Sequence, residues 1–329
     1  MRSSDVPTLP LLTLYLTERC NSRCISCDYW RTGRRDLSLA QLEALLPELR
    51  KLGTREVLIS GGEPLLHPEW PLIADRLRAN GLQLWLLTAG LALAKHATAA
   101  AERFERITVS LDGADRQSYA AIRGVDAFDP VCAGIRAAVR AGATVNLRVT
   151  VQRGNFRLLP KFVELARKLG AASVSFLAAD VANTAAFGRE HEQEGDGHIA
   201  LDSAELDEFS AVLDDLQRTE AAAFAERFIE ESPLKLRRLH AYYAALAGQS
   251  EFPAVRCNAP EFSAVVQADG QVRPCFFIPG PPALPGAPLS AALNAPMMRL
   301  LRENIAAGRR AECERCVCAK WREPEAATA

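Results

Sequence analysis

Cysteine is the residue type in this chain whose spacing points most directly to chemistry. Of the nine cysteines, three lie close together near the amino terminus, five lie in the last quarter, and Cys132 stands alone. The first group is Cys20, Cys24 and Cys27, and the second is Cys257, Cys275, Cys313, Cys316 and Cys318. No histidine accompanies either group at the spacing of a zinc finger. Ligand sets made only of thiolates suit iron–sulfur clusters or zinc.

The first group supplies three thiolates from one loop, with the spacing CxxxCxxC. A 4Fe-4S cluster held by three cysteines keeps one iron open for an outside ligand. The alternatives are a zinc site with a distant fourth ligand, or three incidental thiols.

The second group can supply a complete set of four thiolates. Residues 268–270 predict a hairpin turn that brings Cys257 near Cys275, and Cys313 and Cys316 add a CxxC pair. Four such thiolates can hold a second 4Fe-4S cluster, and a zinc ribbon is the alternative.

Two cysteines remain outside these ligand sets. Cys318 is interpreted either as an alternate ligand or spare thiol near a cluster, or as a catalytic donor of a hydrogen atom to a substrate radical. Cys132 follows Pro130 and Val131 at the start of a predicted helix, which favours the role of a small buried hydrophobic residue.

Composition limits the class of protein around these cysteines. The 329 residues carry 39 Lys plus Arg and 40 Asp plus Glu, and this balance gives no reason to expect nucleic acid as a partner. No apolar run is long enough to span a membrane, and the amino terminus lacks the apolar core of a secretion signal. We therefore expect a cytoplasmic protein, in which clustered cysteines are more often metal ligands than disulfides.

The elements that must position the cysteines follow a repeating strand–helix pattern. Strands are predicted at 11–16, 56–60, 83–87, 107–111, 145–151 and 173–177, with helices between them. Six such units predict a parallel sheet, either a partial, open-sided barrel or a doubly wound sheet. In both folds, ligands bind at the carboxyl ends of the strands.

Local signals mark individual helices. Ser38 and Gln41 predict a capping box, and Asp129 is predicted as an N-cap. Helices are also predicted over 202–231 and 233–247, after a polar loop at 183–200. The predicted division is 1–180 for the barrel, 181–251 for a helical linker or insertion, and 252–329 for a cysteine-rich domain.

The motifs at successive strand ends resemble those of the radical S-adenosylmethionine (SAM) superfamily. CxxxCxxC follows the first strand, SGGEP the second, TAG the third and SLDG the fourth, and Arg148 lies on the fifth. In that family the backbone of the GGE motif and its glutamate, here Glu63, hold the amino group of SAM. The resemblance implies a cofactor site made of Ser60, Gly61, Gly62, Glu63, Pro64, Thr88, Ser110, Asp112 and Arg148.

The resemblance also implies a fold and a chemistry. The fold is α/β, a partial (β/α)6 barrel followed by a small cysteine-rich domain that holds an auxiliary cluster. An electron from the three-cysteine cluster cleaves SAM, and the resulting 5′-deoxyadenosyl radical removes a hydrogen atom from the substrate. An external one-electron reductant such as flavodoxin or ferredoxin is then required.

The pattern CX12GX4C followed by CxxC resembles the twitch domain of these enzymes, and the first part of the longer SPASM domain. The later SPASM cysteines are missing, so one auxiliary cluster is expected. A cluster with four cysteine ligands suits electron transfer, which favours oxidation of a small sugar-like or cyclitol-like metabolite, with epimerisation as the close second.

Two further hypotheses belong to other classes. One is a maturase of ribosomally made peptides. About 10 residues before the first strand leave no room for an amino-terminal peptide-recognition domain, which a separate recognition protein could still supply. The other is a non-catalytic iron–sulfur or zinc regulator, against which the GGEP and SLDG motifs argue. The absence of a carboxyl-terminal Gly-Gly argues against molybdopterin-type chemistry.

Overall fold

The computed structural model describes residues 5–181, 183, 186–188, 198–282 and 286–323. Its strands are β1 (Leu11–Thr17), β2 (Glu56–Gly61), β3 (Gln83–Thr88), β4 (Arg106–Ser110), β5 (Val145–Val151), β6 (Ser173–Ala178), β7 (Ser263–Val266) and β8 (Val272–Arg273). Within the described ranges they form one sheet in the order β6-β5-β4-β3-β2-β1-β7-β8. The strands predicted for the barrel agree with β1–β6 to within one residue at each end.

Sixteen helical segments accompany the sheet in the part of the chain that the structure describes. Those of the first half are α1 (Tyr29–Thr32), α2 (Leu39–Lys51), η1 (Pro64–Leu66), α3 (Trp70–Ala79), α4 (Leu93–Ala101), α5 (Arg116–Arg123), α6 (Phe128–Arg140), η2 (Phe156–Leu158) and α7 (Leu159–Leu169). Those of the second half are α8 (Leu206–Thr219), α9 (Ala221–Ala225), α10 (Pro233–Leu246), α11 (Ala259–Phe262), α12 (Leu289–Leu293), α13 (Pro296–Ala306) and α14 (Ala311–Glu314).

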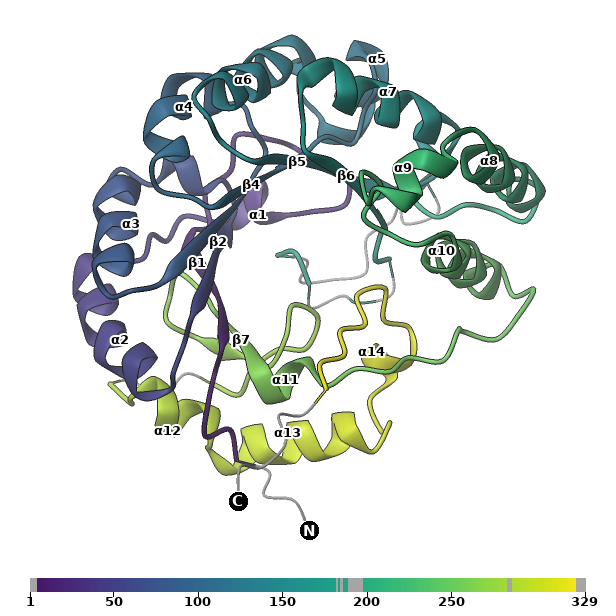
Figure 1. Ribbon diagram of the computed structural model, residues 1–329. Coiled ribbons are helices and arrows are strands. Elements are labelled where there is room, and N and C mark those ends of the chain that lie inside the picture. Colours follow the sequence, from purple (N-terminus) through teal and green to yellow (C-terminus); the bar gives the residue numbers. More distant parts are fainter. Residues whose placement is uncertain (1–4, 182, 184–185, 189–197, 283–285, 324–329) are drawn as a thin grey trace.

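The sheet has a helix-covered outer face and an inner, concave face (Figure 1). Strands β1 to β6 are parallel neighbours, and an apolar row crosses β1 to β5 in register on the outer face. Its residues Leu14, Ile59, Leu86, Ile107 and Val145 are each 1% exposed or less. Helices on one face only are the mark of a barrel rather than a doubly wound sheet, which carries helices on both faces. The predicted partial barrel is confirmed, and the doubly wound alternative is wrong.

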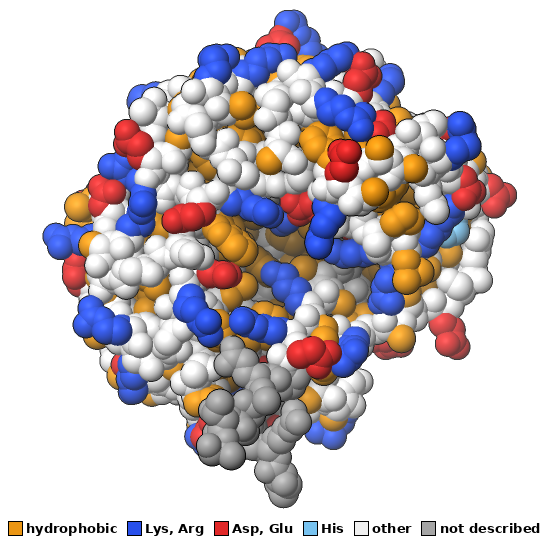
Figure 2. Space-filling model, viewed as in Figure 1, with side chains coloured by type: hydrophobic (Ala, Val, Ile, Leu, Met, Phe, Trp, Pro, Cys, Tyr) orange, Lys and Arg blue, Asp and Glu red, His pale blue; other side chains and the backbone are white. Residues whose placement is uncertain are grey.

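Alternate residues point into the concave face and are more polar. Thr13, Ser60, Thr108, Ser110 and Arg148 occupy such positions, since side chains of a strand alternate between its two faces. In the view of Figure 2 the molecule is hollowed at its centre, and Lys and Arg side chains border the hollow. The interior of the barrel is therefore not a closed apolar core.

Local capping signals explain where several helices begin. The predicted capping box is present at α2, where Ser38 Oγ accepts from Gln41 N and the Gln41 side chain accepts from Ser38 N at 2.8 Å. The prediction of Asp129 as N-cap is wrong, because α6 begins at Phe128 after Ala127 and Asp129 lies inside its first turn. Helix α5, whose capping box joins Asp115 to Ser118, was not predicted.

The predicted helix over 202–231 is shorter in the structure. Helices α8 and α9 end by Ala225, and the next residues run beside β6 with a bridge between Ile229 and Val174. The Glu231 carboxylate accepts from Phe176 N at 2.7 Å and from Ser175 Oγ at 3.0 Å. The unpaired edge of β6 thus gains hydrogen-bond partners that a helix at this position would not supply.

The predicted hairpin of the cysteine-rich region is confirmed, and it also extends the barrel sheet. β7 pairs antiparallel with β8 around a turn at Gly270, whose φ is +84°. β7 also pairs parallel with β1, from Leu11 opposite Ser263 to Leu14 opposite Val266. The cysteine-rich region therefore packs directly on the first strand of the barrel. The predicted loop at 183–200 lies largely outside the described residues.

Among the described helices, none is long and apolar enough to cross a bilayer.

Candidate active site

The loop that carries the first three cysteines lies across the carboxyl ends of the strands. It leaves β1 after Thr17 and is anchored to α5 by Arg23 N to Arg123 O at 2.9 Å and Ile25 N to Ile122 O at 3.1 Å. Asp28 N then donates to Phe187 O at 2.9 Å, in the segment after β6. These bonds hold the loop over the end of the barrel where the sequence predicts ligands.

Cys20, Cys24 and Cys27 form a group of half-buried thiols. Burial, together with a smaller contribution from the neighbouring thiols of the group, raises the pKa of Cys20 to about 11 and that of Cys27 to about 12. Thiols of this kind stay protonated until a cation replaces the proton. A donor set of three thiols without carboxylate or imidazole fits iron–sulfur chemistry.

No three His, Cys, Asp or Glu side chains converge as ligands of one metal ion within the described ranges. The cysteines of a 4Fe-4S cluster bind different iron atoms, so they need not converge on one point.

The glycines of the GGEP motif let the end of β2 approach the start of the cysteine loop. Gly61 has φ +122°, and a Cβ there would lie 2.4 Å from Thr17 O. A Cβ on Gly62 would lie 2.2 Å from Arg19 O. Gly62 N donates to Thr17 O at 2.7 Å, and Glu63 N donates to Arg19 O at 2.8 Å. The close approach that these glycines allow is to protein backbone, just before Cys20.

Glu63 is fully buried and occupied by protein donors. Its carboxylate accepts from Leu65 N at 3.0 Å, from Thr88 Oγ1 at 2.8 Å and from Ala89 N at 2.7 Å. It thereby joins the end of β2 to the end of β3. Burial raises the pKa of Glu63, and these hydrogen bonds oppose that rise. Thr88 is therefore a hydrogen-bond donor to Glu63. Pro64, the residue after Glu63, is the first residue of η1.

Asp112 has a similar linking role. Its carboxylate pairs with Arg123 at 3.0 Å and accepts from Thr150 N at 2.7 Å, which joins β4, α5 and β5. Burial raises the pKa of the Cys24 thiol, and the charge of Arg123 opposes the rise. Arg123 is a site residue that sequence reasoning missed. The capping box of α5 marks the start of this helix but does not single out Arg123.

Three of the predicted cofactor residues share the concave face near the strand ends. Ser60 lies opposite Tyr15, and Ser110 lies opposite Arg148 in register. The buried Nε of Arg148 has no hydrogen-bond partner within the part of the chain described. A half-buried guanidinium with a free donor fits an anionic group such as the carboxylate of SAM.

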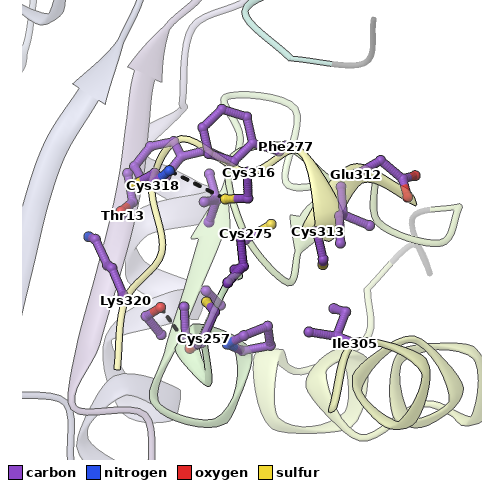
Figure 3. A pocket seen from close by; sticks show the side chains of 18 of the residues that line it. Thr13, Cys257, Cys275, Phe277, Ile305, Glu312, Cys313, Cys316, Cys318 and Lys320 are labelled. Carbon is purple, nitrogen blue, oxygen red and sulfur yellow. Dashed lines mark hydrogen bonds between the residues drawn. The ribbon is translucent and has the colours of Figure 1, made fainter. Parts of the chain in front are cut away.

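All five cysteines of the second group line one cavity. Figure 3 shows Cys257, Cys275, Cys313 and Cys316 gathered there, with Cys318 N donating to Cys316 Sγ at 3.3 Å. Burial raises the pKa of Cys275 and Cys316, and raises that of Cys313 to about 11. The predicted grouping is thus present, with one thiol more than a four-cysteine cluster needs.

The two cysteine groups lie at opposite ends of the concave face of β1. Leu11 and Thr13 line the cavity of the second group, whereas the loop of the first group begins after Thr17. Thr13 and Thr17 are about 13 Å apart along an extended strand. Between them, Tyr15 packs edge-on against Tyr29 at a ring distance of 6.0 Å. Cys132 is elsewhere, buried in α6 as predicted.

A family model described as the Radical SAM superfamily matches residues 14–173. The probable GTP 3',8-cyclase of Methanopyrus kandleri is 39% identical over 155 residues, which are 45% of this chain and 50% of that protein. Mycofactocin maturase MftC of Mycobacterium tuberculosis is 32% identical over 176 residues, 52% of this chain and 44% of that protein. The chain thus spans about half the length of these curated relatives.

Two solved structures are similar over most of the chain. Streptococcus suis SuiB bound to precursor peptide SuiA has a TM-score of 0.66 at 15% identity, covering 90% of this chain and 67% of that one. Native anSMEcpe with bound AdoMet has a TM-score of 0.64 at 16% identity, covering 88% and 83%. At these identities the likeness shows the fold. Together with the motif order at the strand ends, the match over residues 14–173 establishes that this chain carries a domain of the radical SAM superfamily.

Proposed function

We propose that this protein is an enzyme that reductively cleaves SAM and uses the product to remove a hydrogen atom from a small polar substrate. Cys20, Cys24 and Cys27 would hold the 4Fe-4S cluster that binds SAM. Cys257, Cys275, Cys313 and Cys316 would hold a second. When bound, these cofactors supply hydrogen-atom abstraction and one-electron transfer, and the protein supplies position and exclusion of water.

The single observation that carries this proposal is the arrangement along β1. One strand presents the second cysteine group beside Leu11 and Thr13, and leads at its carboxyl end into the loop of the first group. A substrate in the concave face would lie between a site for SAM and a site for electron transfer. Such an arrangement serves oxidation, in which a substrate radical must lose one further electron.

The cofactor roles divide between contact and positioning. Ser60, Ser110 and Arg148 face the concave side and are proposed to contact SAM, with Arg148 on its carboxylate. Glu63, Thr88 and Asp112 are engaged with neighbouring strand ends and are proposed to hold that surface in shape. Gly61, Gly62 and Pro64 are proposed to place the backbone that faces the SAM amino group.

We assign oxidation of a sugar-like or cyclitol-like alcohol as the reaction, with epimerisation as the second choice. The polar side chains of the concave face, including Thr13 and Thr108, favour a polar substrate over an apolar one. The proposed division of labour is 1–180 for SAM cleavage, 181–251 for cover of the β6 edge, and 252–329 for the second cluster.

Peptide maturation is the alternative function. Its support is the 32% identity to mycofactocin maturase MftC, which covers 44% of that protein. The matched part overlaps the domain that cleaves SAM, so it does not separate a peptide from a small metabolite.

The substrate class is tested by the formation of 5′-deoxyadenosine. The reconstituted, reduced protein is incubated with SAM alone, with aminosugars or aminocyclitols, and with short peptides. We expect the polar metabolites to raise 5′-deoxyadenosine above the background seen with SAM alone. Stimulation by peptides alone would contradict the assigned substrate class. No cleavage under any condition would favour a non-catalytic iron–sulfur protein.

Cys318 separates the two reactions of small metabolites. In a dehydrogenase, Cys318→Ala should retain most turnover. In an epimerase, it should still cleave SAM but fail to form the epimer, and the wild-type product should carry one solvent deuterium. Loss of the second cluster in Cys318→Ala would instead make Cys318 a ligand in place of Cys313 or Cys316.

A further inference from the structure

A second surface of the cysteine loop has no role in the site described above. It is a hollow of about 550 Å³ lined by Cys20, Asn21, Ser22, Arg23, Trp30, Arg31 and Arg34. The concave-face residues Ser60, Ser110 and Arg148 do not line it. The hollow therefore lies between the two arms of the loop, residues 20–23 and residues 30–34.

The lining of this hollow is strongly basic. It includes three arginines and, among the described residues, no Asp or Glu. Arg34 donates to the carbonyl oxygens of Gly33 and Arg31, and neither Arg34 nor Arg23 forms an ion pair with a carboxylate in the described ranges. Arg31 pairs with Asp28 at 2.9 Å but keeps 58% of its side chain exposed. Among the described residues, the charge of Arg23 and Arg34 is therefore not compensated by an ion pair, in a chain whose net charge is -1.

The same surface combines charge with apolar area. The Arg31 guanidinium lies 4.3 Å from the centre of the Trp30 ring, and Ile25, in the same loop, is 40% exposed. Trp and Arg are enriched at protein interfaces, where Trp supplies rigid contact area. An inorganic anion or a small metabolite would not need a half-buried tryptophan and an exposed isoleucine beside the arginines.

Cys20 connects this surface to the chemistry. It is the cysteine of the first group that lines the hollow, so the hollow is a short route from solvent to a cluster held there. Electron transfer between proteins weakens steeply with distance, which makes the surface nearest the ligands the favourable place for a donor. Interfaces of redox partners are small and transient, and complementary charge accelerates their encounter.

We propose that the hollow formed by Arg23, Trp30, Arg31 and Arg34 is the docking site of an acidic one-electron carrier protein. This inference rests on the proposed function, since it assumes that the first cysteine group holds a cluster that must be reduced. The carrier presents carboxylates to the arginines and places its redox group beside Cys20.

The test uses the double variant Arg23→Glu/Arg34→Glu in the full-length, reconstituted protein. Arg140→Glu is the matched control, because Arg140 is exposed in the last turn of α6, at the opposite end of the barrel strands. Binding of an acidic flavodoxin is measured by titration calorimetry, and cluster reduction by the reduced flavodoxin is followed by stopped-flow absorbance. Both are measured at low and high salt, and dithionite serves as a small reductant that needs no docking surface.

At low salt, the affinity of the double variant for flavodoxin and the rate at which reduced flavodoxin reduces its cluster should both be at least about ten-fold lower than in the wild type, since steering charges alter association by this much or more. The difference should shrink at high salt. Arg140→Glu should match the wild type, and dithionite should reduce all three proteins equally. If the double variant binds flavodoxin and is reduced by it as well as the wild-type protein is, the proposed docking site is wrong.

The measurement of flavodoxin binding does not depend on SAM cleavage, so it tests the docking site separately from the proposed function. Failure of dithionite to support SAM cleavage in the wild type would contradict the proposed function alone. Tighter binding of a nucleic acid than of flavodoxin at this surface would also overturn the assigned partner.

Discussion

At the scale of single residues, the conspicuous polar side chains of this site mostly hold the protein together. Glu63 joins β2 to β3, and Asp112 joins β4 and β5 to α5 through Arg123. By contrast, the buried Nε of Arg148 has no protein partner among the residues that the structure describes. The buried carboxylates of such a motif can therefore hold the strand ends in position, while the backbone of the motif makes most of the contacts with the ligand.

Glu63 provides the first prediction at this scale. Glu63→Ala should lower the free energy of unfolding by about 2 kcal/mol or more, because it leaves the amides of Leu65 and Ala89 buried without an acceptor. It should also weaken SAM binding while both clusters remain. Urea unfolding and equilibrium dialysis with SAM measure the two effects.

Glu63→Gln is the control, because it keeps one acceptor oxygen in nearly the same volume. It should recover a large part of the lost stability. Unchanged SAM affinity in Glu63→Ala would count against the site after β2.

Arg148 provides the second prediction. Arg148→Met keeps an apolar side chain of similar length but removes the free donor, so it should weaken SAM binding about ten-fold, the effect of one charge-assisted hydrogen bond. Its thermal unfolding temperature should stay near that of the wild type, because the lost nitrogen had no protein partner among the described residues. Unaltered SAM affinity would remove Arg148 from the cofactor site.

At the scale of elements, the position of the cysteine loop depends on close backbone contacts. Gly124, at the end of α5, has φ +69°, and a Cβ there would lie 2.1 Å from Arg23 O. The neighbouring Arg23 N to Arg123 O bond anchors the loop to the helix. The geometry of the first cysteine group is therefore set partly by a helix about a hundred residues away in sequence.

Gly124→Ala tests this anchor, with Gly53→Ala as its control. Both glycines adopt positive φ, +69° and +63°, but no atom lies within 4 Å of a Cβ built on Gly53. Gly53→Ala should lower the free energy of unfolding by about 1–2 kcal/mol, because alanine at this position must adopt the left-handed backbone conformation. Gly124→Ala should lower the free energy of unfolding by more than Gly53→Ala does. It should also reduce SAM binding and iron retention at the first cysteine group. Equal effects of the two variants on SAM binding would contradict the anchoring role.

The elements also show which parts of the fold a sequence can predict. β1 to β6 were predictable because a parallel strand buried on its outer face has a strong apolar signal, as in ITVSL and VNLRVTV. The capping box of α2 was equally local. The end of the helix before Glu231 was not predictable in this way, because it depends on the unpaired edge of a strand more than fifty residues away.

The candidate site likewise has features that local sequence predicts and features that depend on distant contacts. The two cysteine groups and their positions at the strand end and in the hairpin were readable from spacing. The pairing of β7 with β1 was not, since β7 is a short apolar strand that could pair with several edges. Arg123 was missed because its importance comes from its contacts with Asp112 and the cysteine loop rather than from a motif.

At the scale of the whole molecule, the account joins two cysteine groups through one strand. The half-barrel presents the loop of Cys20, Cys24 and Cys27 at its carboxyl end, and the carboxyl-terminal region brings its five cysteines to the concave side of β1 (Figures 1 and 3). Because the groups come from separate parts of the chain, each can be removed without the other. That separation makes the central claim directly testable.

The decisive measurement is iron content and 5′-deoxyadenosine formation in anaerobically reconstituted protein that lacks one group at a time. The wild type should bind about eight irons per chain, the content of two 4Fe-4S clusters. The change of Cys20, Cys24 and Cys27 to Ala should remove about half of the iron and all SAM cleavage. The change of Cys257, Cys275, Cys313 and Cys316 to Ala should also remove about half of the iron, while SAM cleavage by dithionite-reduced protein persists. Formation of 5′-deoxyadenosine by the protein without Cys20, Cys24 and Cys27 would contradict the account.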